Sequence, residues 1–150
     1  MNIRDYLLPS EGVRWETLLS FWVPPLPDRY TIWFVNRFGD VFATTADSTV
    51  LRLDLGSGTC REVAQSREHF ARLLNIETNA QEWLRIDLVD ACRKAGMTPG
   101  RYECLGFRIP PTLGGRYELA NITPTNLLVH YSYQAYICKQ QDIYWIPPSD

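Results

Sequence analysis

The sequence has 150 residues, a formal net charge of −2, 45% hydrophobic residues and 21% charged residues. This composition allows one sizeable hydrophobic core, and it excludes both intrinsic disorder and the basic surface that direct binding of nucleic acid requires. The first residues lack the apolar segment of a signal peptide, and no apolar run reaches the roughly 20 residues of a membrane span. We therefore expect a cytoplasmic protein that does not contact a membrane.

The N-terminal half predicts one helix followed by a meander of strands. Apolar residues at helical spacing predict a helix over Ser10–Trp22, with Ser10 as its cap, which the prolines after Val23 end. Aromatic and β-branched segments then alternate with turn residues, among them Gly39 and the hairpin-like Gly56-Ser57-Gly58. The predicted antiparallel strands are Tyr30–Asn36, Asp40–Thr45, Thr49–Asp54 and Cys60–Ala64.

The C-terminal half predicts two helices and two returning strands. Ser66 caps a first helix, and Asn79 caps a second helix that runs to Ala95 and ends at Gly96. Strands are expected over Glu103–Ile109 and Asn126–Cys138.

This order of elements does not alternate as βαβ units do, so it predicts an α+β fold. We expect an antiparallel sheet, built from the meander and the returning C-terminal strands, with helices packed on one of its faces. The whole chain is expected to form one domain: an N-terminal helix and proline-rich connector over 1–29, a body over 30–140, and a proline-containing tail over 141–150.

The titratable side chains form no recognisable catalytic, metal or cofactor site. The sequence has two histidines, of which His69 is expected at the surface. His130 lies in a predicted strand, where a core or sheet-edge histidine is favoured over a general base. The four cysteines, at positions 60, 92, 104 and 138, are widely spaced and predict buried thiols rather than disulfides or a zinc site. We expect no enzyme activity and no cofactor.

One predicted helix has a mixed aromatic and acidic strip. With the side that carries Leu84 and Leu88 facing the core, Trp83, Ile86, Asp87 and Asp90 fall elsewhere on the helical wheel. These four residues are candidates for binding a partner. The alternative is that another element, such as the N-terminal helix, covers Trp83, because large aromatic residues are usually buried.

A second candidate surface is the loop after the Glu103–Ile109 strand. Pro110 and Pro111 make its start rigid, whereas Gly114 and Gly115 make its end permissive. Such a loop can present a binding surface with little loss of entropy. The candidate binding residues around it are Phe107, Arg108, Arg116 and Tyr117. A tight structural crossover between strands would explain the same pattern.

Several of these motifs recur together in one known family. They are Phe38-Gly39-Asp40-Val41-Phe42, Leu53-Asp54 with Gly56 and Gly58, Val63-Ala64-x-Ser66, Glu82-Trp83-Leu84, and Cys104-x-Gly106-Phe107-x-x-Pro110-Pro111-x-Leu113-Gly114-Gly115-x-Tyr117, followed by Asn121 and His130. Over about residues 30–140 the chain resembles the C-terminal domain family of bacterial type VI secretion immunity proteins. Better-known members protect a cell from a DNase effector, and their domain follows a separate GAD-like region that is nearly absent here. The resemblance implies no catalytic residues.

Two hypotheses for function follow. In the first, the chain is an immunity protein that binds a cytosolic effector toxin, expected to be a nuclease, and blocks or distorts its active site. Acidic residues such as Glu82, Asp87 and Asp90 would then steer association, with Trp83, Phe107 and Tyr117 as anchors. In the second, the chain is a sensor of a nucleotide or metabolite, in which Arg108 or Arg116 meets an anionic ligand near His130. The sequence leaves the oligomeric state open.

Overall fold

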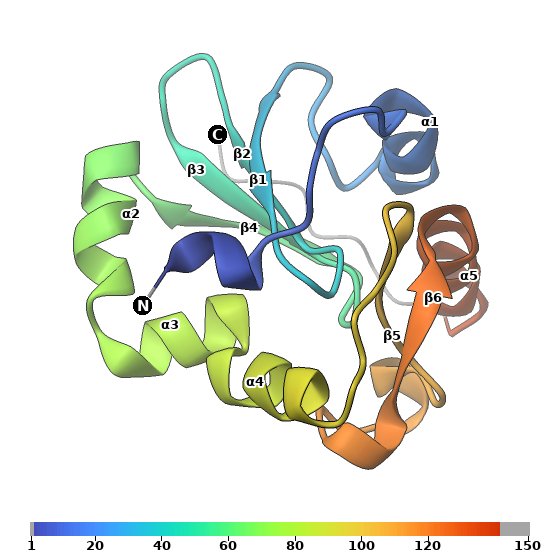
Figure 1. The fold of residues 1–150 in the computed structure, drawn as a ribbon. Helices are drawn as coiled ribbons and strands as arrows, with labels where there is room; N and C mark the ends of the chain where they lie inside the picture. The colour runs from blue at the N-terminus through green and yellow to red at the C-terminus, as the bar shows by residue number, and fades with distance from the viewer. Residues whose placement is uncertain (1, 142–150) are drawn as a thin grey trace.

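The computed structural model describes residues 2–141, and the predicted α+β class is confirmed (Figure 1). The helices are α1 (Trp15–Leu19), α2 (Arg67–Leu74), α3 (Glu77–Leu84), α4 (Ile86–Lys94) and α5 (Leu127–Gln140). The strands are β1 (Thr31–Val35), β2 (Val41–Thr44), β3 (Val50–Asp54), β4 (Thr59–Ala64), β5 (Glu103–Phe107) and β6 (Ile122–Asn126). Short 3₁₀ segments are η1 (Ile3–Tyr6), η2 (Ser20–Trp22), η3 (Pro111–Leu113) and η4 (Leu119–Asn121). Apart from Gln141, the predicted tail lies outside the described residues.

The predicted meander is confirmed. Strands β1 to β4 form one antiparallel sheet in sequence order. The Gly56-Ser57-Gly58 segment forms the turn between β3 and β4, where Gly58 has a φ of 76° and donates its N–H to the Asp54 carbonyl at 2.9 Å. A positive φ favours glycine, which explains this turn from the sequence.

The C-terminal strands do not join the meander. Strands β5 and β6 form a separate antiparallel pair, which is linked to the β1–β2 turn by the hydrogen bond from Leu105 N to Arg37 O at 2.8 Å. The predicted strand over Asn126–Cys138 is wrong, because this segment is helix α5. The buried residues of α5 recur every three or four positions, and the Asn126 side chain caps the helix by accepting from Val129 N at 3.2 Å.

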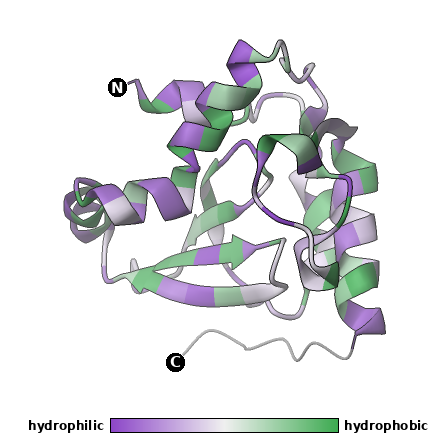
Figure 2. Ribbon diagram, turned by 90° about the horizontal axis from the view of Figure 1, so that it is seen from below, coloured by the Kyte–Doolittle hydropathy of each residue, from purple (hydrophilic) through white to green (hydrophobic). Residues whose placement is uncertain are grey.

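Helices cover both faces of the four-stranded sheet rather than one. Val41 and Ala43 face the cluster that contains Trp22 of η2 and Tyr131 of α5. Phe42, between them in the strand, faces the cluster of Phe70 on α2 and Trp83 on α3. Figure 2 shows apolar residues both in the strands and along α5. The expectation of one covered face is wrong, because the segment predicted as the strand Asn126–Cys138 is helix α5, which packs on the second face.

The helix ends agree in part with those predicted from the sequence. Ser66 caps α2 through its hydroxyl, which accepts from His69 N at 3.0 Å, and Gly96 follows the end of α4 with a φ of 82°. The helix predicted from Asn79 to Ala95 is instead two helices, because Arg85 has φ 53° and ψ 48°. Asn79 lies inside α3 and donates to Leu73 O at 3.0 Å instead of capping a helix.

The N-terminal helix is shorter than predicted. It begins after Arg14, and Ser10 is not its cap but accepts a hydrogen bond through its carbonyl from Trp15 Nε1 at 3.2 Å. No helix among residues 2–141 has both the length and the apolar character needed to cross a membrane.

Trp83 lies near the end of α3, two residues before the break at Arg85. Its side chain is only 7% exposed and stacks on Phe70, with ring centroids 4.8 Å apart. Another element therefore covers Trp83, as the alternative held, but that element is α2 and not the N-terminal helix. Trp83 is not available as an anchor for a partner.

We predict that Trp83→Ala destabilises the fold. Removing a buried Trp side chain leaves a cavity, so the free energy of unfolding should fall by about 3–5 kcal/mol in urea denaturation. Asp87→Ala, at the exposed start of α4, should change it by less than about 0.5 kcal/mol. Equal stability of the two variants would contradict the burial of Trp83.

Candidate functional site

The segment between β5 and β6, residues 108–121, is the proline-glycine loop, and backbone hydrogen bonds fix its first turn. The Leu113 and Gly115 N–H groups both donate to Pro110 O, at 2.9 and 3.0 Å, and Gly114 N donates to Pro111 O at 3.1 Å. Gly114 has a φ of 96°, a conformation that favours glycine. The order of prolines and glycines thus produces one compact turn.

The side chain of Asn121 closes the loop at its far end. Its Oδ1 accepts from Ile109 N at 2.8 Å, and its Nδ2 donates to Ile109 O at 2.9 Å and to Arg116 O at 3.0 Å. A Cβ on Gly115 would lie 1.7 Å from Ile109 O, so only glycine allows this approach. The loop is therefore a tight crossover, as one interpretation of the sequence held.

The inner side of the loop packs on aromatic residues. The Tyr117 ring lies edge-on to Phe107 and Phe38, at centroid distances of 5.1 and 5.9 Å. The Arg85 guanidinium lies 3.6 Å from the centre of the Tyr117 ring, the geometry of a cation–π contact. Burial, together with the negative charges of Asp40 and Asp54, raises the pKa of the Tyr117 phenol. Phe107 and Tyr117 are half-buried and hold the loop in place.

The outer side of the loop presents large apolar residues to solvent. Ile109 is 52% exposed, Leu113 49% and Leu119 39%, and the predicted Arg108 and Arg116 are exposed beside them. We call these five residues the loop face. Its three aliphatic members were not among the predicted binding residues. For Leu113 and Leu119 the available signal was a turn-rich segment with no helical or strand periodicity, whereas Ile109 ends the predicted strand Glu103–Ile109, which in the structure stops at Phe107.

A cavity of about 260 Å³ lies at the contact between the loop and the β3–β4 turn. Pro111, Thr112 and Tyr117 line one side of it, and Asp54, Gly56 and Ser57 line the other. A second cavity of about 360 Å³ shares Asp54 and Ser57 with the first and extends along β4 toward Glu82. The loop and the end of the meander thus border one hollowed surface.

An ion-pair cluster lines the second cavity through Arg52, Asp54 and Glu82. The Arg52 guanidinium is 3.1 Å from Asp40, 3.7 Å from Asp54 and 3.7 Å from Glu82. Burial alone would lower the pKa of Arg52, but the Asp40 and Asp54 carboxylates outweigh it and raise this pKa. Burial, reinforced by the charge of Asp40, raises the pKa of Asp54. The cluster ties β3 to α3 and contains more carboxylates than guanidinium groups.

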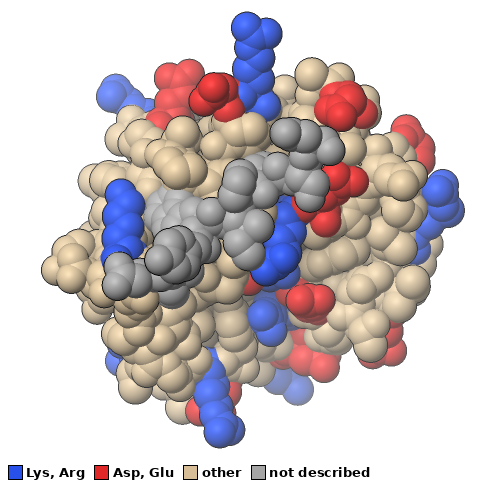
Figure 3. Space-filling model, turned by 180° about the vertical axis from the view of Figure 1, so that it is seen from behind, with Lys and Arg blue, Asp and Glu red and all other residues tan. Residues whose placement is uncertain are grey.

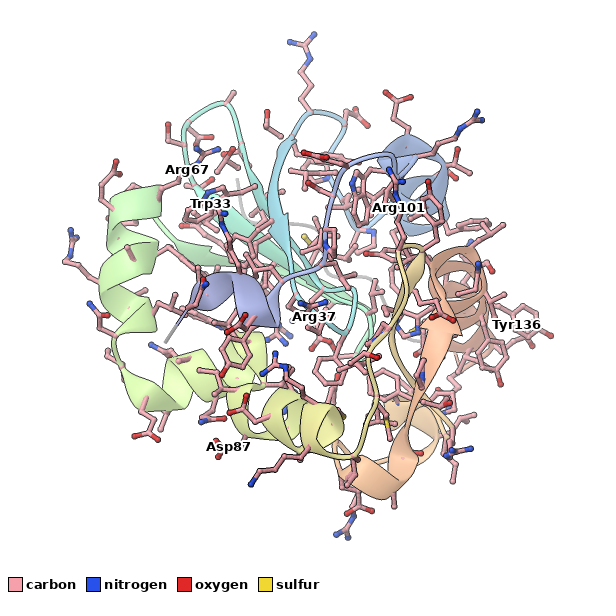
Figure 4. All side chains as sticks on the ribbon, viewed as in Figure 1. Trp33, Arg37, Arg67, Asp87, Arg101 and Tyr136 are labelled. Atoms are coloured by element: carbon pink, nitrogen blue, oxygen red, sulfur yellow. The ribbon has the colours of Figure 1, made fainter. Side chains whose placement is uncertain are left out.

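The predicted aromatic and acidic strip does not form a continuous surface. Ile86 is partly buried, and Asp90 accepts from the Tyr6 hydroxyl at 2.9 Å and pairs with Arg93 at 3.3 Å. Asp87 is exposed and points outward, with its Oδ1 bound to Gln81 Nε2 at 3.1 Å (Figure 4). On the face seen from behind, acidic and basic side chains are interspersed (Figure 3).

His130 lies in the core, but on a helix rather than in a strand. Its Nε2 is 2.9 Å from Phe38 O, and since a carbonyl only accepts, Nε2 carries the proton. Burial lowers the pKa of the imidazole to about 4, so it is neutral at physiological pH. His130 is buried while Arg108 and Arg116 are exposed, so the imidazole is not open to a ligand from solvent as the predicted sensor site would require.

The cysteines are free and buried, as predicted. Burial raises the pKa of Cys60 to about 12 and that of Cys138 to about 11, so both thiols remain protonated. His69 is partly exposed and accepts from Gln65 N at 3.0 Å. Within residues 2–141, no group of three or more His, Cys, Asp or Glu side chains is placed to hold a metal ion.

Comparison with known families gives a match over part of the chain. Residues 64–136 match the family described as T6SS immunity protein Tdi1, C-terminal. The matched segment is just under half of the chain, and it includes α2 to α4, the whole proline-glycine loop and α5 as far as Tyr136. The resemblance to the C-terminal domain of this immunity protein is therefore shown, although Phe38–Phe42 and the rest of the meander before Ala64 lie outside the match. No curated protein matches the chain.

We predict that His130 makes stability depend on pH. Its pKa is about 4 in the folded protein and 6.5 in the unfolded chain, so the unfolded chain takes up the proton first as the pH falls. The contribution of His130 to the free energy of unfolding is therefore complete above pH 6.5 and is lost toward pH 4. Between pH 7.5 and pH 5 the free energy of unfolding should fall by about 2 kcal/mol. In urea denaturation, His130→Gln should remove this part of the pH dependence and His69→Gln should not. The same pH slope in wild type and His130→Gln would refute the assignment.

We also predict that Asn121→Ala loosens the proline-glycine loop. The substitution leaves Ile109 and Arg116 backbone groups without partners and should lower the free energy of unfolding by about 2–4 kcal/mol. Hydrogen exchange at the Ile109 amide should become faster. Glu118→Ala, at an exposed position of the same loop, is the matched control. Similar exchange in both variants would show that Asn121 does not order the loop.

Proposed function

We propose that this chain is an immunity protein that binds an effector toxin through the loop face and blocks its active site, and that the effector is a nuclease. The match over residues 64–136 supports an immunity function. The nuclease target is supported by the resemblance to a family whose better-known members counter a DNase. Acting by binding alone requires no catalytic group in this chain.

The observation on which the proposal depends is the contrast between the two sides of the loop. The outer side exposes Ile109, Leu113 and Leu119, while Asn121 and Gly115 fix the backbone beneath them. Single exposed apolar residues are normal on a protein surface, but three large aliphatic side chains exposed within one ordered loop support its use as an interface. Because the loop is already ordered, a partner that binds it loses little conformational entropy.

The charged residues around the loop face are suited to orienting the effector. Arg108 and Arg116 are exposed among the apolar residues, and the planar guanidinium can bind a carboxylate through two parallel hydrogen bonds. Nuclease active sites that hold metal ions are rich in carboxylates, so two arginines beside an apolar contact would fit the entrance of such a site. Exposed Glu82 and Asp87 would act at longer range on a basic nucleic-acid channel.

The test is capture of the effector encoded by a neighbouring gene. The wild-type protein should bind it and inhibit its cleavage of plasmid DNA. Leu113→Glu places a charge within the loop face and should weaken binding by about 30-fold or more, the effect of losing a hot-spot residue. Binding would be measured by titration calorimetry, and inhibition by gel electrophoresis of the plasmid.

The matched control is Ile76→Glu. Ile76 is 51% exposed and lies between α2 and α3, away from the loop in the sequence. This variant should retain binding and inhibition. If Leu113→Glu binds as tightly as Ile76→Glu, the loop face is not the binding surface. If wild-type protein binds the effector without protecting the plasmid, neutralisation of a nuclease is excluded.

A further inference from the structure

Two arginines converge where η1, α4 and the β1–β2 turn meet. Arg37 Nε donates to Asp5 O at 3.2 Å, and Arg93 Nη2 donates to the same oxygen at 2.8 Å. Because both hydrogen bonds end on one atom, the two guanidinium groups lie close together. Figure 4 shows Arg37 between η1 and α4. This pair of arginines belongs neither to the loop face nor to the ion-pair cluster of Arg52.

Each arginine of this pair is fixed by the residues around it. The Arg37 carbonyl accepts from Leu105 N at 2.8 Å, which anchors the backbone of the turn to β5. Arg93 is 3.3 Å from Asp90 and lies over the Tyr6 ring, whose hydroxyl donates to the same carboxylate at 2.9 Å. The two positive charges are therefore held together before any ligand binds, and a preorganised site loses little entropy on binding.

Both arginines line a cavity of about 140 Å³. Its other lining residues are apolar or carry a hydroxyl: Val89, Met97, Thr98, Pro99 and Leu105. Among residues 2–141 no acidic side chain lines this cavity, in contrast to the two cavities beside the proline-glycine loop, both of which Asp54 lines. Ordinary ligand pockets have volumes of roughly 300 Å³ or more, so this cavity can hold one compact group rather than a whole metabolite.

The positive charge at this cavity is incompletely neutralised. Arg93 pairs with Asp90, but their side chains are 46% and 47% exposed, and exposed ion pairs attract each other weakly. Within residues 2–141, Arg37 forms no ion pair, and its Nη groups donate no hydrogen bond. Burial and the charge of Arg93 lower the pKa of Arg37, and the Asp5 carboxylate offsets this only in part. An anion between the two guanidinium groups would relieve their repulsion.

The C-terminal end of α4 opposes an anion here, because the helix dipole is negative at that end. The carbonyls of Ala91, Cys92 and Arg93 already accept backbone hydrogen bonds at 2.9–3.0 Å, and Arg93 and Lys94 occupy the last turn. The dipole amounts to roughly half an elementary charge. It therefore offsets only part of the two full charges of the arginines.

We propose that this cavity binds a phosphate group, which lies between Arg37 and Arg93 and accepts a further hydrogen bond from the Thr98 hydroxyl. A phosphate group carries about −1.5 to −2 charges at pH 7 and several acceptor oxygens, so it matches two guanidinium groups. A carboxylate has one charge and two oxygens, which a single guanidinium satisfies. A larger molecule would place only its terminal phosphate in the cavity.

The site is independent of the proposed immunity function, because none of its residues belongs to the loop face. It also differs from the anion site that the sequence predicted at Arg108 and Arg116. Arg37 and Arg93 are far apart in the sequence, and the Asp5 carbonyl of η1 brings their side chains together.

Titration calorimetry of the full chain with inorganic phosphate tests the proposal. At constant ionic strength phosphate should bind at one site, and acetate at the same concentrations should not bind measurably. Arg37→Gln and Arg93→Gln should each weaken phosphate binding by about 10-fold or more, since each removes a hydrogen bond from a charged donor. Arg101→Gln is the matched control, because it removes the same charge from an exposed arginine outside the cavity (Figure 4). It should bind phosphate as wild type does, and circular dichroism should show that all three variants are folded.

A second measurement uses the wild-type protein and so does not depend on the folding of a variant. In nitrogen–proton correlation spectra, the Nε–H signals of Arg37 and Arg93 should shift when phosphate is added, and that of Arg101 should not. Adenosine monophosphate is the second probe. Tighter binding than inorganic phosphate would identify a terminal phosphate as the ligand, and weaker binding would identify free phosphate; both results support the site.

Three results would overturn the proposal. The first is that wild-type protein binds neither inorganic phosphate nor adenosine monophosphate. The second is that Arg37→Gln binds phosphate as tightly as Arg101→Gln. The third is that acetate binds as tightly as phosphate, which would assign the arginine pair to a carboxylate.

Discussion

The β1–β2 turn, residues 36–40, is the feature on which the other elements depend. Asn36 is fully buried, and its Nδ2 donates to Trp83 O at the end of α3 at 2.9 Å. The Phe38 and Gly39 carbonyls accept from His130 and Tyr131 of α5, and Arg37 O accepts from Leu105 of β5. Asp40 pairs with Arg52 of β3. Removing one partner of a buried pair typically costs about 3–5 kcal/mol, so this turn is a demanding constraint on the fold.

The same turn supports the proline-glycine loop. The Phe38 ring contacts both Phe107 and Tyr117, and the Arg85 guanidinium lies over the Tyr117 ring. Arg85 holds a left-handed conformation that is unusual for a residue other than glycine, and such strain persists only where the surroundings determine it. The loop is therefore ordered from beneath by the core and from within by Asn121. An ordered base with an apolar exposed side is a better binding surface than a flexible loop of the same composition.

The sequence was most informative where a local physical rule decides the structure. Turn residues separated the strands of the meander, the Ser66 hydroxyl capped α2, and the prolines and glycines of the loop indicated its rigidity. It was less informative where tertiary contacts decide. Nothing local distinguishes Arg85 from a residue inside a helix, because the break is stabilised by packing of Trp83 on Phe70 and of Arg85 on Tyr117. The exposure of Leu113 depends likewise on what the rest of the chain leaves uncovered.

Helix α5 shows why an incorrect assignment can itself be informative. A helix at a protein surface is recognised by charged residues on its outer side, and α5 has none between Leu127 and Cys138. Its Val and Tyr residues favour a strand by composition, so the predicted strand followed from the same side chains that are exposed in the structure. The helix is therefore recognised from its buried positions, which recur every three or four residues, and not from a charged outer side.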